Sequence, residues 1–89
     1  MRQELVEIYS DATNAAVLRH PNRRFPGVLL QGDTLHMLCH KIDAAIEKVD
    51  RTSAAYKELN EVRNSLWSFK NHYKSVLVEH EILIPFSEV

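Results

Sequence analysis

The sequence predicts an α+β fold: a small antiparallel sheet of about three N-terminal strands packed on an antiparallel two-helix hairpin. Three observations lead to this class. Short apolar runs separated by turn residues fill the first third of the chain. Two stretches with the apolar periodicity of amphipathic helices follow. The polar link between these stretches, residues 50–53, is short, which favours antiparallel neighbours.

The expected strands are consecutive. Residues 5–9 are rich in β-branched and aromatic side chains, and a cluster of turn-forming residues follows them. Residues 15–18 form the second expected strand, with a helical turn as the alternative because alanine prefers helices. Residues 27–31 form the third strand after the turn signal Pro26-Gly27. Three such strands with short links form most simply a meander.

The first helix is expected over residues 33–49. Asp33 precedes the periodic run, so its carboxylate can accept hydrogen bonds from the free N–H groups of the first turn. Gly32 is expected to make the bend before the helix through a positive φ. Cys39 is expected as a small buried filler at the edge of the apolar stripe. The stripe comprises Leu35, Leu38, Ile42, Ala45, Ile46 and Val49.

The second helix is expected over residues 54–82, capped by Thr52 or Ser53 and ended by Pro85. Its apolar residues recur at alternating spacings of four and three, which is a heptad-like seam. The seam residues are Ala55, Leu59, Val62, Leu66, Phe69, Tyr73 and Val76.

The length of the second helix favours a further contact. A continuous helix over residues 54–82 spans ~43 Å, whereas the first helix covers only ~25 Å. The sheet, a bend in the helix or a second copy of the protein can cover the overhang. Trp67 lies outside the seam, so it either covers the sheet or forms a second packing face. The expected interaction surface is therefore Trp67, Phe69, Tyr73 and Val76.

Length and composition limit the class of protein. The 89 residues predict a single domain over residues 1–89. A net charge of −1 makes nucleic acid an unlikely partner, and no apolar run is long enough to cross a membrane. Cys39 is the one cysteine, so no internal disulfide can form. We expect a cytoplasmic protein.

A basic segment offers a candidate binding site. Its members are Arg19, Arg23, Arg24 and Phe25, with Gln31 in the turn before the first helix. Guanidinium groups bind carboxylate or phosphate through paired hydrogen bonds, and a neighbouring aromatic ring can stack on a base. The alternative is a solvated loop whose arginines pair with acidic residues of the second helix.

A weaker candidate is a metal site on one flank of the first helix. His36 and His40 are one helical turn apart, and Asp43 could supply a third ligand. The residue between the histidines that would act as a base in a zinc protease is Met37 here. The same flank is also typical of an ordinary solvated helix.

Several short motifs resemble a family of small bacterial domains of unknown function. The front half carries residues 14–17, then Phe25-Pro26-Gly27 and Gln31-Gly32-Asp33, and the tail carries residues 79–82 followed by Pro85-Phe86. The likeness covers most of the chain. It departs at Glu81, where the family has glycine. The resemblance implies a bacterial source and transfers no activity, cofactor or catalytic residue.

These observations favour a non-enzymatic protein-interaction module, homodimeric or bound to another protein, in the manner of an immunity or antitoxin protein. The alternative is a small protein that binds a ligand or nucleic acid through residues 19–24. A third hypothesis is a metal-dependent enzyme at His36 and His40.

Overall fold

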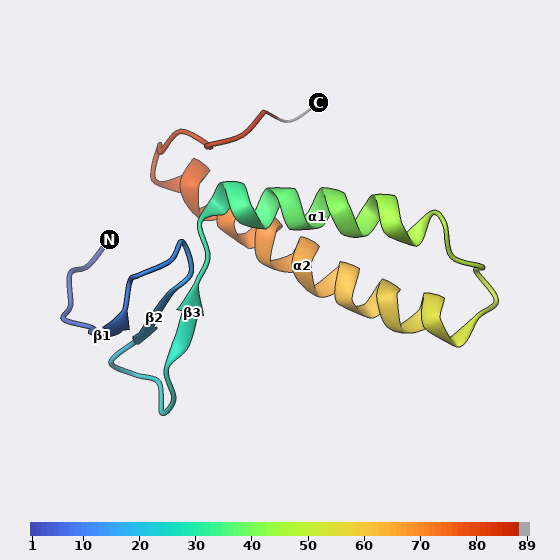
Figure 1. Ribbon diagram of the computed structural model, residues 1–89. Helices are drawn as coiled ribbons and strands as arrows, with labels where there is room; N and C mark the ends of the chain where they lie inside the picture. The colour runs from blue at the N-terminus through green and yellow to red at the C-terminus, as the bar shows by residue number, and fades with distance from the viewer. Residues whose placement is uncertain (88–89) are drawn as a thin grey trace. The chain divides into compact units, whose positions relative to one another are not determined.

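A computed structural model describes residues 1–87 and confirms the expected α+β class (Figure 1). Its elements in chain order are β1 (Glu7–Ser10), β2 (Ala16–Arg19), β3 (Gly27–Leu29), α1 (Gly32–Ile46) and α2 (Ala54–Glu79). Contacts divide the chain into two compact units, Met1–Gln31 with the sheet and Gly32–Val89 with the helices. The single domain and the packing of the sheet on the helices stay predictions.

The sheet is the expected antiparallel meander, with strand order β1-β2-β3. β2 pairs with β3 in a regular register that places Ala16 opposite Leu29 and Val17 opposite Val28. The pairing of β1 with β2 shifts between Ile8 and Ser10, which leaves Tyr9 as the extra residue of a bulge. Residues 16–19 are a strand, so the helical alternative is wrong. No side chain of residues 1–31 is fully buried.

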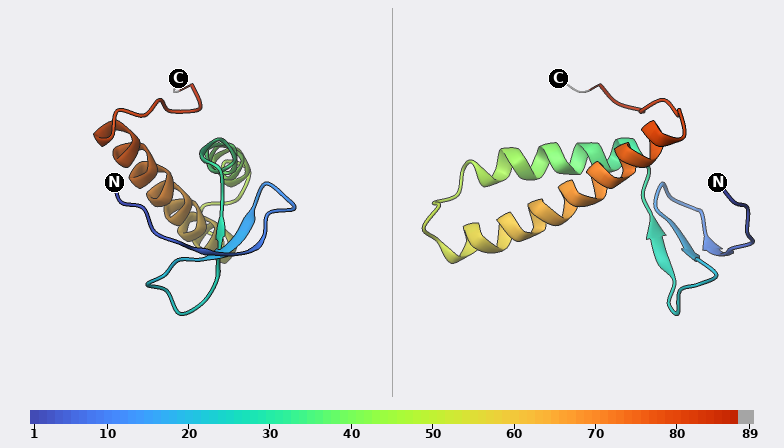
Figure 2. Two further views of the ribbon diagram at one scale, coloured as in Figure 1. Left: turned by 90° about the vertical axis from the view of Figure 1, so that its left-hand side faces the viewer. Right: turned by 180° about the vertical axis from the view of Figure 1, so that it is seen from behind.

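The two helices lie against each other and run in opposite directions (Figure 2). The expected stripe of α1 supplies the apolar core, where Leu35, Cys39 and Ile46 are buried. The one buried residue of α2 among those described is Lys70, with 2% of its surface exposed. The core of this unit therefore combines an aliphatic stripe from α1 with a long cationic side chain from α2.

The inner face of α2 is rotated from the expected seam, and part of the seam remains half-buried: Leu59, Leu66 and Tyr73. Val62 and Phe69 belong to the expected seam, yet they are 52% and 63% exposed. The residues that follow them, Arg63 and Lys70, face α1 instead. The hydrogen bond of Arg63 and the burial of the Lys70 side chain set this rotation. Apolar periodicity predicts neither interaction, because both residues are polar.

The first helix begins at Gly32, one residue before the expected position, and both glycines of the chain have negative φ. The expected positive φ at Gly32 is therefore wrong. Glycine is required there for space, because a β-carbon would overlap the ring of Tyr73. Asp33 lies inside the first turn, and its Oδ1 accepts the Thr34 N–H at 2.9 Å.

The second helix is continuous from Ala54 to Glu79, shorter than expected by three residues. Ser53 caps its start by accepting the Tyr56 N–H at 3.1 Å, as expected. At its end the N–H groups of Ile82 and Glu81 donate to the carbonyls of Leu77 and Val78. Glu81 sits at the left-handed position of this Schellman motif with φ 56°.

Candidate functional site

The link between β2 and β3 carries the basic segment, and internal bonds hold its base. Arg19 forms an ion pair with Glu7 of β1 and donates from Nη1 to the Arg23 carbonyl at 3.1 Å. The bond and the charge of Glu7 raise the pKa of Arg19. The Arg23 N–H closes the turn on the His20 carbonyl at 3.0 Å. Arg19 is therefore a structural residue of the sheet, paired with β1 rather than with the second helix.

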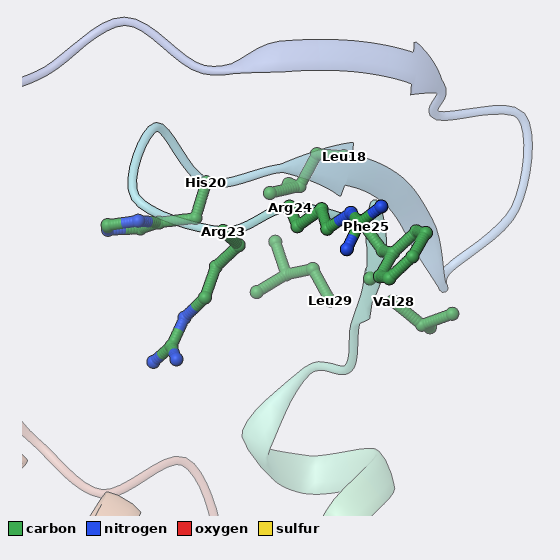
Figure 3. Close-up of a pocket in the computed structure, with 8 residues that line it drawn as sticks. Leu18, His20, Arg23, Arg24, Phe25, Val28 and Leu29 are labelled. Carbon is green, nitrogen blue, oxygen red and sulfur yellow. The ribbon is translucent and has the colours of Figure 1, made fainter.

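A cavity of ≈ 470 Å³ opens beside this turn (Figure 3). In Figure 3 the side chain of Leu29 lies between those of His20 and Arg23 on one side and the ring of Phe25 on the other. The Arg24 guanidinium carbon lies 5.3 Å from the centroid of the Phe25 ring. The lining residues are Leu18, His20, Arg23, Arg24, Phe25, Gly27, Val28 and Leu29. Of the predicted site residues, Arg23, Arg24 and Phe25 meet here, whereas Arg19 and Gln31 do not line the cavity.

The histidine flank of α1 takes part in aromatic packing. The rings of His36 and His40 have centroids 4.3 Å apart, and His36 stacks on Phe86 at 4.2 Å. Asp43, the proposed third ligand, is occupied by other partners. Across residues 1–87 no group of three His, Cys, Asp or Glu side chains is placed to hold a metal ion. The described residues thus lack the ligand set that the metal hypothesis needs.

Asp43 is a polar hub between the helices. Its Oδ1 accepts from Arg63 Nε at 2.7 Å and from Trp67 Nε1 at 3.1 Å. Trp67 therefore lies in the contact between α1 and α2, and the expectation that it lies apart from this contact is wrong. Apolar periodicity could not predict this hydrogen bond of the Trp67 indole, because its partner is a carboxylate 24 positions away in the sequence.

Beside the hub, Lys70 lies between two aromatic rings. Its Nζ is 4.2 Å from the Trp67 ring centroid and 5.1 Å from that of Phe86. Cation–π attraction offsets part of the cost of removing the ammonium from water. Burial raises the pKa of the neighbouring Cys39 thiol, and the charge of Lys70 opposes that change. Cys39 is thus the small buried filler that the sequence predicts.

The predicted interaction surface on α2 separates into two parts. Trp67 and Tyr73 face inward, on Asp43 and Gly32 respectively. Phe69 is exposed and Val76 is half-buried. We call Ala55, Val62, Phe69 and Val76, which are seven residues apart in succession, the outer row of α2. Val62 belongs to this row and was missing from the predicted surface.

Within residues 1–87, no helix is long and apolar enough to span a membrane. A second, polar concavity of ≈ 280 Å³ lies where Asp43, Glu47, Arg51 and Arg63 meet near the link between the helices. Arg63 and Asp43, two of the four charged residues that line this cavity, form an ion pair with each other.

These features define a small α+β protein with a helical pair, an open basic cavity on its sheet unit and an apolar outer row on α2. The chain belongs to a family of unknown function (DUF6959), whose family model matches residues 1–86. The resemblance to a family of unknown function is therefore confirmed. No curated protein and no solved structure matches the chain.

Proposed function

We propose that the protein is a non-enzymatic interaction module that forms a homodimer through the outer row of α2. The observation that carries this proposal is the exposure of Val62 and Phe69, at 52% and 63%, on a helix that already buries another face against α1. Two large apolar side chains on one exposed line favour a further contact, because burying apolar surface stabilises association.

The spacing of the outer row supports a helical partner. Residues seven apart stay nearly in line on a helix, which is the geometry of coiled-coil packing. A second copy of α2 presents the same line, so the surface can be self-complementary about a two-fold axis. Polar residues, among them Glu58, Ser65 and His72, flank the row and would form the rim of the contact.

Within this class we propose an immunity- or antitoxin-like role in the cytoplasm. The small size of the chain supports it, and a helix of a target protein could cover the outer row as well as a second copy. The buried Cys39 thiol also suits a compartment that keeps cysteines reduced.

Sedimentation equilibrium on three proteins tests the dimer. The wild type should dimerise, and Phe69→Lys should be monomeric because a lysine in the centre of the contact is costly to bury. Val78→Lys is the matched control, since Val78 is 67% exposed and lies about 180° from Phe69 around the helix. It should dimerise like the wild type. A wild type that stays monomeric at every concentration would overturn the homodimer. Equal weakening by both variants would overturn the outer row as its contact surface.

A further inference from the structure

We propose that the outer edge of β3 binds an extended peptide in which acidic and apolar residues alternate, and that the peptide adds to the sheet as a fourth strand. This surface lies on the sheet unit and is separate from the outer row of α2. The inference therefore goes beyond the proposed homodimer and does not depend on it.

The position of β3 in the sheet gives the first argument. The strand order β1-β2-β3 leaves one side of β3 without a strand partner among residues 1–87. An edge strand presents unpaired N–H and C=O groups, and a peptide that pairs with them gains main-chain hydrogen bonds. The opposite edge of the sheet, formed by β1, is less suited to an added strand, because a bulge at Tyr9 interrupts it and Glu7 forms an ion pair with Arg19.

The cavity beside β3 gives the second argument. Leu18, Phe25 and Leu29 provide an apolar floor, which can take every second side chain of an added strand. Val28 and Leu29 are 62% and 50% exposed, so an added strand can bury apolar surface on this edge strand. A strand is favoured over a small ligand because its backbone adds hydrogen bonds that the shallow cavity lacks.

The charge of the cavity rim gives the third argument. Within the described part of the chain, the sheet unit forms two ion pairs, Arg2 with Glu4 and Arg19 with Glu7. Arg23 and Arg24 take part in no ion pair among residues 1–87, and both line the cavity. Two guanidinium groups of this kind favour carboxylates, which they can bind through paired hydrogen bonds. The complementary peptide therefore carries Asp or Glu beside its apolar residues.

A displayed library of random seven-residue peptides, selected on the full-length protein, tests this chemistry. Enriched peptides should alternate acidic with aliphatic or aromatic residues. An R23A/R24A double variant should bind the enriched peptide at least about tenfold more weakly in fluorescence anisotropy, as loss of charged hydrogen bonds implies. Arg2→Ala is the matched control, because it removes one positive charge from the same unit outside the cavity, and it should bind normally.

Two N-methylated versions of the enriched peptide test strand addition itself. Alternate N–H groups of a β-strand point in opposite directions, so methylation of one alternate set should abolish binding and methylation of the other should not. Equal binding by both versions would overturn the fourth strand.

Enrichment of peptides without acidic residues, or enrichment unaffected by R23A/R24A, would overturn the charge argument. Binding of a single-stranded RNA through Arg23 and Arg24 with no peptide enriched would assign the cavity to nucleic acid instead. Circular dichroism should show that R23A/R24A keeps the wild-type fold.

Discussion

At the scale of single residues, Gly32 shows how a glycine can be required for space alone. Its φ is negative, so its conformation is open to any residue. The constraint comes from Tyr73 of α2, whose ring occupies the place of the missing side chain. Gly32 thus lets the start of α1 approach the end of α2, which brings the two helices of the pair together.

Gly32→Ala should destabilise the protein by about 1–2 kcal/mol, because the Tyr73 ring has to leave its contact. The higher helix preference of alanine acts in the opposite direction by about 1 kcal/mol. A net loss of stability would therefore identify the steric overlap with the Tyr73 ring. Urea unfolding measures the change. In the double variant G32A/Y73L the loss from the alanine should shrink, since the ring is gone. Gly27→Ala is a control with open space around it and should be close to neutral.

Glu81 is a residue in an unfavourable conformation. It holds φ 56° to complete the Schellman motif after α2, and a side chain in that region costs roughly 1–2 kcal/mol. Glu81→Gly should therefore stabilise the protein by about 1 kcal/mol. The gain is reduced because glycine increases the conformational entropy of the unfolded chain. Thermal unfolding measures this. Glu79→Gly, the same exchange at the last residue of α2, should instead destabilise by up to about 1 kcal/mol. A loss of stability in both would contradict the role of φ at Glu81.

At the scale of elements, apolar periodicity located both helices and the stripe of α1 but only part of the inner face of α2. Leu35, Cys39 and Ile46 are buried as the pattern predicts. In α2, however, Arg63 and Lys70 count as polar in any periodicity, although one bonds Asp43 and the other lies over Trp67. The sequence could identify the basic segment, and Arg23, Arg24 and Phe25 do line one cavity. The pairing of Arg19 with Glu7 depends on strand register, which short strands specify weakly.

Asp43 is expected to fix the register of α1 against α2. Asp43→Ala removes the acceptor shared by Arg63 and Trp67 and should destabilise the protein by about 1–3 kcal/mol. Asp43→Asn keeps an oxygen acceptor and should cost less. Urea unfolding gives the stability, and a red shift of Trp67 fluorescence reports the loosened indole. Glu47→Ala, a change at the exposed residue that follows α1, is the control and should have little effect. An Asp43→Ala protein as stable as the wild type would show that packing alone sets the register.

At the scale of the whole molecule, burial is distributed unevenly between the two units. Every described residue that is fully buried lies between Gly32 and Lys70, whereas residues 1–31 contain none. The helical pair thus holds a core of its own. The three strands are four, four and three residues long and expose most of their apolar side chains. A sheet of this kind is of low stability until a further surface covers it.

Hydrogen exchange of the intact protein, followed by mass spectrometry, measures this difference. Amides of β1, β2 and β3 should exchange through local opening, and those in the centres of α1 and α2 only through global unfolding. Low concentrations of denaturant should accelerate exchange in the helices and leave that in the sheet nearly unchanged, because local opening exposes little surface. Sheet amides as slow as those of the helices would place both units in one cooperative structure. If the added strand on β3 is correct, the selected peptide should slow exchange in the sheet while the helices keep their rates, since binding stabilises only the state that binds.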